Sequence, residues 1–146
     1  ILREARAPAG LGPAVEAAAA EAAGRIAEAL DYVGVLAVEL FVEADGTLRV
    51  NEIAPRVHNS GHWTIEGAQT CQFENHVRAV MGWPLGSTAL RGTSVMRNLL
   101  GAEAEAWAEL AARPGVHLHL YGKRRVAEGR KMGHVTEIGP LPPPVA

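Results

Sequence analysis

Apolar positions recur first with the period of a helix and then with that of strands. From residue 14 to residue 30 they follow helical spacing, as Val15, Ala19, Ala22, Ile26 and Leu30. This spacing predicts an amphipathic helix, and Pro13 suits its first position. Residues 33–42 are almost wholly apolar and rich in valine, which predicts a buried strand. Asp45-Gly46 follows as a strong hairpin signal, and residues 47–53 return as a second strand.

The second half of the chain predicts one long helix and then several short elements. Thr64 opens a helix expected to run to about Met81, where Gly82 and Pro84 end it. Further elements are expected as a strand over 93–100, a short helix over 103–112, strands over 116–121 and 130–138, and a basic turn over 122–129. With a short strand within residues 1–9, this order predicts an α+β fold with largely antiparallel pairing.

Composition narrows the class of protein. The 146 residues are 48% hydrophobic with a net charge of -2, which suits one domain or two small lobes. No apolar run reaches the ~18 residues of a membrane span, and the scattered arginines form no stripe for nucleic acid. Cys71 is the single cysteine, which excludes an internal disulfide framework. We therefore expect a cytoplasmic globular protein that has neither a membrane nor nucleic acid as a partner.

Two glutamates are expected to oppose each other in the hairpin. A two-residue turn at Asp45-Gly46 places Phe41 opposite Val50 and Glu39 opposite Glu52, and a three-residue loop would shift this register. Opposed residues have Cβ atoms roughly 4.5–5.5 Å apart, so the two carboxylates repel each other. Either a cation lies between them, or one is protonated, or basic residues neutralise both. Mg²⁺ prefers such oxygens, whereas the structural alternative is a solvent-facing Glu39 paired with an arginine.

The loop after the hairpin is dense in polar side chains. It carries a fixed cation, two imidazoles, an amide and a hydroxyl, as Arg56, His58, Asn59, Ser60 and His62. The guanidinium suits an oxyanion or a carboxylate, and the imidazoles suit hydrogen bonding or proton transfer. The alternative is a structural loop whose polar groups cap the helix at Thr64 and pair with carbonyls.

Several strings together resemble the C-terminal half of the N5-carboxyaminoimidazole ribonucleotide synthetases, the family of the ATPase subunit of phosphoribosylaminoimidazole carboxylase. The strings are DYVGV at 31–35, ELF at 39–41, NEIAPRVHNSGHWT at 51–64, QFE at 72–74, SVMRNLLG at 94–101, HLYGK at 119–123 and GRKMGH at 129–134. The family consists of ATP-grasp enzymes of purine biosynthesis. The resemblance spans nearly the whole chain and implies the C-terminal part of an ATP-grasp domain followed by a small β-rich lobe.

The resemblance implies an ATP- and Mg²⁺-dependent carbon–nitrogen ligase. Such an enzyme carboxylates 5-aminoimidazole ribonucleotide with bicarbonate, through carboxyphosphate. Glu39 and Glu52 are then expected to hold two Mg²⁺ ions on the phosphates of ATP, with Asn51 beside them. Arg56 and His58 are expected to be catalytic. The expected substrate-binding residues are Asn59, Ser60, His62, Lys123, Arg130 and Lys131, although a basic turn without the resemblance is an ordinary solvated loop.

The expected domains are residues 1–82, the C-terminal half of an ATP-grasp domain, residues 83–139, a β-rich lobe, and residues 140–146, a proline-rich tail. No string matches the family's N-terminal part, so we expect that missing portion as a partner and a homodimer as the assembly. The alternatives are a ligand-binding module, a fragment that complements a separate N-terminal chain without catalysing, and another ATP-grasp carboxylase.

Overall fold

The structure is a computed structural model that describes residues 1–141, so residues 142–146 of the predicted proline-rich tail lie outside it. The described chain forms two compact units. Residues 1–8, 62–71 and those from Thr88 onward make up one, which we call the sheet unit. Residues 9–61 and 72–87 make up the other, which we call the hairpin unit. The predicted domain limit between residues 82 and 83 stays a prediction.

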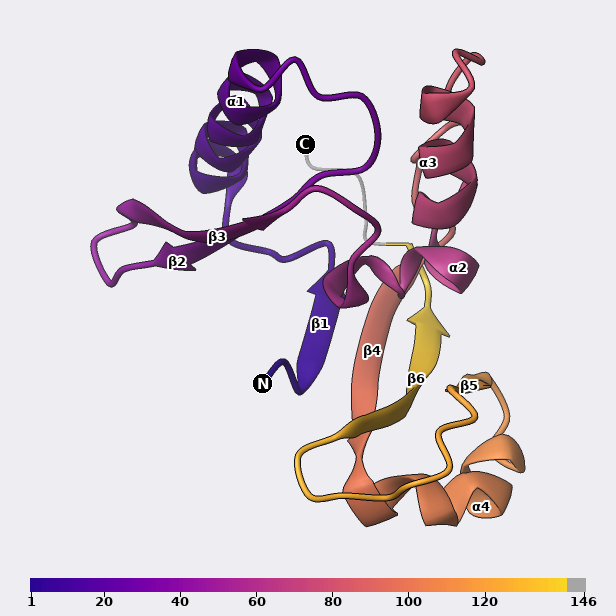
Figure 1. The fold of residues 1–146 in the computed structure, drawn as a ribbon. Coiled ribbons are helices and arrows are strands. Elements are labelled where there is room, and N and C mark those ends of the chain that lie inside the picture. Colours follow the sequence, from indigo (N-terminus) through magenta and orange to yellow (C-terminus); the bar gives the residue numbers. More distant parts are fainter. Residues whose placement is uncertain (142–146) are drawn as a thin grey trace. The chain divides into compact units, whose positions relative to one another are not determined.

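The hairpin unit contains one long helix beside a two-stranded sheet. Helix α1 (Pro13–Ala29) begins with proline at its first position, as the sequence predicts. Strands β2 (Ala37–Val42) and β3 (Leu48–Ala54) pair antiparallel, and α1 lies against them in Figure 1. Ile26 of α1 and Val50 of β3 line a common hollow. Helix α1 therefore contacts the hairpin along β3, although none of its residues is buried.

The register of the hairpin contains two irregularities that cancel. The loop has three residues, because the Glu43 N–H donates to the Thr47 carbonyl at 2.9 Å and Gly46 takes a φ of 85°. Phe41 consequently pairs with Arg49, so the predicted pairing of Phe41 with Val50 is wrong. A β-bulge between Glu39 and Leu40 restores the register by leaving Asn51 unpaired. Glu39 pairs with Glu52, as predicted.

Strand β2 begins later than the apolar run predicts. The predicted strand covers residues 33–42, but pairing begins at Ala37. Gly34 has a φ of 135°, which departs from strand geometry. The N–H of Val35 donates to Nδ1 of His76 at 3.0 Å, and the Tyr32 hydroxyl donates to the Val35 carbonyl at 3.1 Å. Residues 33–36 are thus bound to helix α3 (Gln72–Val80) rather than to a strand.

The sheet unit contains a four-stranded antiparallel sheet. Its strands run in the order β1 (Glu4–Ala7), β4 (Thr93–Leu100), β6 (Lys131–Gly139) and β5 (Val116–Leu120). The elements η2 (Gly101–Ala106) and α4 (Trp107–Ala111) contact this sheet (Figure 1). Met96, Leu99, Met132 and Val135 form its apolar core. The predicted α+β class is confirmed, and no helix within residues 1–141 is long and apolar enough to cross a bilayer.

The single long helix predicted from Thr64 to Met81 is wrong. It is divided into α2 (Thr64–Gly67) in the sheet unit and α3 in the hairpin unit. Ala68 ends α2 with extended backbone, φ -115° and ψ 157°, and bridges to Leu90. At Gly67 a Cβ would collide with the Ser94 hydroxyl, so glycine permits α2 to approach β4. This break results from pairing with a distant segment, which helical periodicity does not reveal.

Two glycine substitutions are expected to change stability in opposite directions. A Cβ at Gly133 of β6 would collide with the backbone carbonyl of His119 in β5, so the strand would have to move. Gly133→Ala should lower the free energy of unfolding by about 1–3 kcal/mol. Gly24→Ala in α1 has nothing within 4 Å and should raise it by about 0.5–1 kcal/mol. Urea denaturation measures both free energies of unfolding. An unchanged free energy of unfolding in Gly133→Ala would contradict the close approach of β5 and β6.

Candidate functional site

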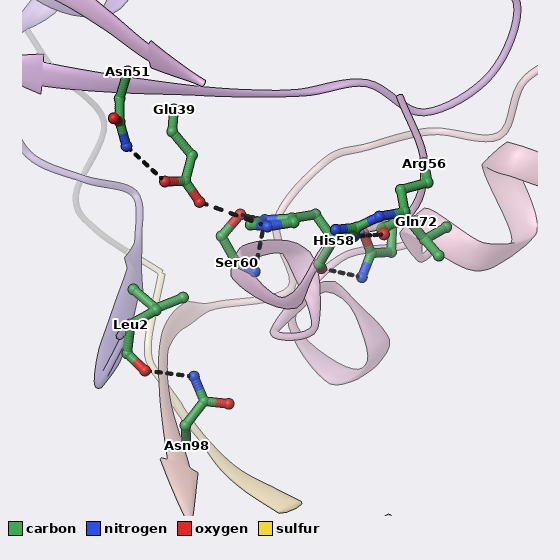
Figure 2. A network of polar contacts seen from close by, with 9 residues as sticks. Leu2, Glu39, Asn51, Arg56, His58, Ser60, Gln72 and Asn98 are labelled. Carbon is green, nitrogen blue, oxygen red and sulfur yellow. Dashed lines mark hydrogen bonds and ion pairs between the residues drawn. The ribbon is translucent and has the colours of Figure 1, made fainter. Parts of the chain in front are cut away.

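Glu39, Asn51 and Glu52 present their polar groups together on the hairpin. Directly opposed residues of an antiparallel pair share one face, so the Glu39–Glu52 pairing places both carboxylates on the same side. The bulge residue Asn51 donates from Nδ2 to Oε2 of Glu39 at 3.2 Å (Figure 2). The Glu39 side chain is 38% exposed and Glu52 is exposed. Solvent and ligands can therefore reach both carboxylates.

His58 connects this pair to the following loop. Its Nε2 lies 3.5 Å from Oε1 of Glu39, and its Nδ1 lies 2.8 Å from Oγ of Ser60 (Figure 2). The Ser60 N–H also donates to Nδ1, at 3.3 Å. An N–H group can only donate, so Nδ1 accepts and a neutral imidazole carries its proton on Nε2. The proton of the neutral His58 ring thus faces the Glu39 carboxylate.

Gln72 supports the loop at His58, a role that is not evident from the sequence. It is the first residue of α3 and is 8% exposed. Its Oε1 accepts the His58 N–H at 2.9 Å, and its Nε2 donates to the His58 carbonyl at 2.8 Å (Figure 2). Its place in the resembling string at 72–74 is the signal that the sequence offers. No residue type or spacing indicates that it reaches back to the loop.

Arg56 and Asn59 flank His58 in the same unit. Arg56 is exposed, and its Nη1 donates to the adjacent Val57 carbonyl at 3.0 Å. Asn59 opens the short turn η1 (Asn59–Gly61) and is half-buried. The hairpin unit therefore brings together the hairpin carboxylates and the loop residues up to Ser60 that the sequence predicts to act at the site.

The remaining predicted site residues lie in the sheet unit. Lys123 donates from Nζ to the Lys131 carbonyl at 2.6 Å, and Arg130 donates from Nη1 to the Arg125 carbonyl at 3.1 Å. These bonds tie together the ends of the basic turn. Lys123 and Arg130 are exposed and keep further N–H donors beyond the bonds named here. Because the two groups of predicted site residues belong to different units, their joint action in one pocket stays a prediction.

His62, the last predicted site residue, belongs to a cluster of rings in the sheet unit. Its ring centroid lies 5.0 Å from that of His134, which stacks on His119 at 4.6 Å. The Tyr121 hydroxyl is 2.9 Å from Nδ1 of His134, and Nε2 of His119 is 2.6 Å from Oε1 of Glu66. The cluster is not evident from the sequence, because its members come from three separate segments.

His134 is the buried centre of that cluster. It is 2% exposed, and among the described residues its Nε2 has no hydrogen-bond partner. Burial, together with the nearby imidazoles of His119 and His62, lowers the pKa of His134 from 6.5 to about 4. His134 is therefore neutral at physiological pH.

The hairpin carboxylates are suitable ligands for a hard cation. Across residues 1–141, no three His, Cys, Asp or Glu side chains gather as metal ligands. The hairpin offers a pair of carboxylates, Glu39 and Glu52, and within the described residues no third ligand of these types completes a group with them. Mg²⁺ is commonly bound by one or two carboxylates with the remaining positions taken by water and substrate phosphates. The exposed pair fits that kind of site.

Comparison with known proteins assigns the chain to a family. The family model described as the ATP-grasp domain matches residues 1–73, which is half of the chain. The chain belongs to the ATP-grasp family. A second model, described as the phosphoribosylaminoimidazole carboxylase C-terminal domain, matches residues 94–141. Together the two matches cover both the hairpin and the last three strands of this ATP-grasp chain.

Curated relatives of this ATP-grasp chain are named N5-carboxyaminoimidazole ribonucleotide synthase. The protein from Vibrio parahaemolyticus is 55% identical over 130 residues, covering 89% of this chain and 34% of the relative. The protein from Bacillus subtilis is 47% identical over 139 residues, covering 93% of this chain and 36% of the relative. The chain thus spans about a third of the length of these relatives. The resemblance inferred from the sequence is confirmed.

Solved structures of such enzymes share the fold. The N5-carboxyaminoimidazole ribonucleotide synthetase of Thermus thermophilus matches with a TM-score of 0.86 and 55% identity, over 95% of this chain and 38% of that one. The synthase of Aspergillus clavatus in complex with ADP and 5-aminoimidazole ribonucleotide matches with a TM-score of 0.90 and 37% identity, over 97% of this chain and 40% of that one.

The buried His134 is expected to make stability depend on pH. Between pH 6.5 and about 4 the unfolded chain binds a proton at this residue and the folded chain does not. Stability should therefore be complete above pH 6.5 and fall as the pH drops toward 4, by up to about 3 kcal/mol. Urea denaturation at several pH values measures this slope.

The matched control for this measurement is His117, an exposed histidine of β5. His134→Asn should flatten the slope between pH 6.5 and 4, whereas His117→Asn should leave it as it is. Equal slopes in both variants would contradict the assignment to His134.

Proposed function

We propose that this chain is the C-terminal, metal- and substrate-handling part of an ATP-dependent ligase. The ligase joins 5-aminoimidazole ribonucleotide and bicarbonate to give N5-carboxyaminoimidazole ribonucleotide, ADP and phosphate in purine biosynthesis. One observation carries the proposal. Glu39 and Glu52 oppose each other on one face of the hairpin, and Nε2 of His58 lies 3.5 Å from Oε1 of Glu39. The Aspergillus clavatus relative, named as a complex with ADP and 5-aminoimidazole ribonucleotide, supports the same substrates.

In the first step, bicarbonate attacks the γ-phosphorus of ATP. The bond from that phosphorus to the β-phosphate oxygen breaks, so ADP leaves and carboxyphosphate forms. Glu39 and Glu52 would hold two Mg²⁺ ions, which offset the negative charge of the phosphates when bound. The exposed guanidinium of Arg56 suits a bicarbonate or carboxyphosphate anion.

In the second step, the exocyclic amine of the ribonucleotide attacks the carbonyl carbon of carboxyphosphate. A carbon–nitrogen bond forms, the carbon–oxygen bond to phosphate breaks, and the amine loses a proton. His58 and Glu39 suit the acceptance of that proton, because an imidazole and a carboxylate can both take up a proton and the two groups lie 3.5 Å apart. The neighbouring Asn59 and Ser60 complete this side of the substrate site.

Basic residues of the sheet unit would bind the substrate phosphate. Lys123 and Arg130 lie in the turn before β6 and donate to the carbonyls of Lys131 and Arg125, and Lys131 is the first residue of β6. A turn held by its own bonds loses less conformational freedom when it binds an anion. His62 would contact the substrate from the start of α2.

The proposed enzyme contains a portion beyond this chain. The chain matches only 34–36% of the length of these relatives, and we propose that an N-terminal portion of the same enzyme supplies the rest of the ATP site. We further propose a cytoplasmic homodimer as the complete enzyme.

A chimeric enzyme tests this function directly. In it, this chain replaces the matching segment of the Thermus thermophilus relative, which is 55% identical. ADP release should require both bicarbonate and 5-aminoimidazole ribonucleotide. A folded chimera without such turnover would contradict the catalytic proposal and favour a ligand-binding remnant.

Removal of one carboxylate charge in that chimera should abolish most of the activity. Glu52→Gln keeps the size and hydrogen bonding of the side chain but removes a charge that the metal needs. We expect turnover to fall by at least roughly 100-fold. Glu43→Gln is the matched control, because Glu43 is an exposed glutamate of the same hairpin that pairs with Arg49. Similar losses in both variants would contradict a special role for Glu52.

Loss of a basic group in the turn should weaken substrate binding selectively. Lys123→Gln is expected to raise the KM for 5-aminoimidazole ribonucleotide by about 10-fold, because a charge-assisted hydrogen bond to phosphate is lost. The KM for ATP should stay unchanged. Arg124→Gln, an exposed neighbour in the same turn, is the control. A KM for the ribonucleotide that changes equally in both variants would argue against a specific contact by Lys123.

A further inference from the structure

We propose that Gln72 is a positioning residue for His58, an inference that rests on the proposed function of His58. The side-chain amide of Gln72 forms two hydrogen bonds with the backbone of His58, which we call the amide pair. Its Oε1 accepts the His58 N–H at 2.9 Å, and its Nε2 donates to the His58 carbonyl at 2.8 Å. Its side chain is buried with 8% of the residue exposed. A buried amide that satisfies both backbone groups of one loop residue fixes that residue firmly.

The His58 backbone needs this support because it lies in no strand or helix. Strand β3 ends at Ala54 and the turn η1 begins at Asn59. A strand residue would obtain such a pair of bonds from a neighbouring strand. Here the first residue of α3 supplies them, so the loop is held against a helix of nine residues.

The carbonyl of His58 accepts two donors. Besides Nε2 of Gln72, the N–H of Gly61 donates to it at 3.0 Å. A Cβ at Gly61 would lie 2.6 Å from Oε1 of Gln72, so glycine leaves the space that the amide occupies. Both lone pairs of this carbonyl are thereby used, and the peptide plane is fixed in orientation.

A fixed backbone sets the position of the His58 ring. The ring stands between Oγ of Ser60 at 2.8 Å and Oε1 of Glu39 at 3.5 Å. A displacement of the loop by about 1 Å would break this arrangement, and such misplacement of a reacting group can cost about 100-fold in rate. Gln72 would therefore act on catalysis through His58 without touching a substrate.

Helix α3 also provides a matched control. Asn75 forms the same kind of amide pair with Gly86, donating from Nδ2 to its carbonyl at 3.2 Å and accepting its N–H at 2.8 Å. The loop that it holds contains no predicted site residue. Loss of this pair should cost the fold a comparable amount without moving His58.

The first experiment measures amide hydrogen exchange in this 146-residue chain. Gln72→Leu removes both bonds and should accelerate exchange of the His58 N–H by at least about 10-fold. Gln72→Glu keeps an acceptor for that N–H and should retain most of the protection. Asn75→Leu should leave His58 unchanged and accelerate exchange at Gly86. Unchanged exchange at His58 in Gln72→Leu would overturn the amide pair.

The second experiment measures turnover in the chimeric enzyme. Gln72→Leu should lower kcat by roughly 10- to 100-fold with the KM for ATP within about twofold, and Gln72→Glu should recover part of that loss. Asn75→Leu should keep kcat within about twofold. An unchanged kcat in Gln72→Leu, or an equal loss in Asn75→Leu, would overturn the positioning role. Failure of the unsubstituted chimera would instead count against the proposed function, since the exchange measurement does not depend on turnover.

Discussion

Repulsion between two carboxylates is the constraint that organises the candidate site. Unit charges 4 Å apart interact by about 1 kcal/mol in water and by about 4 kcal/mol at the effective dielectric constant near a protein surface. Glu39 and Glu52 occupy directly opposed positions of β2 and β3, so their charges lie on one face of the hairpin. The amide of Asn51 and the ring of His58 both approach the Glu39 carboxylate, at 3.2 and 3.5 Å. The nearby Arg49 is paired with Glu43, so it does not neutralise them.

The opposition of the two glutamates could be predicted because a hairpin signal and strand alternation are local. The predicted pairing of Glu39 with Glu52 is correct, but the predicted two-residue turn is not. The loop is one residue longer, and the bulge at Asn51 compensates for the extra residue. A bulge depends on the pairing of both strands, which no short string reveals. The strand over 93–100 and the helix beginning at Pro13 were predictable from periodicity and proline chemistry.

Long-range contacts account for what the sequence did not reveal. The segment after Thr64 has helical composition, yet Ala68 pairs with Leu90 and divides it. Gln72 bonds to a residue 14 positions earlier, and the ring cluster around His134 joins residues from the segment before α2, from β5 and from β6. Such contacts depend on how segments that are distant in the sequence pack together in the fold. The family strings identify the expected site residues themselves. They do not identify the residues, such as Gln72, that hold those site residues in place.

The bulge has a consequence for how this hairpin tolerates changes in length. The bulge at Asn51 and the three-residue loop offset each other, so Glu39 and Glu52 lose their pairing if only one of the two is removed. A change of a single residue in the loop alone would move every position of β3 to the opposite face. Such a change would direct Glu52 away from Glu39. Insertions and deletions in this hairpin are therefore compatible with a shared carboxylate face only as coordinated pairs, so the length of the turn helps to determine the geometry of the candidate site.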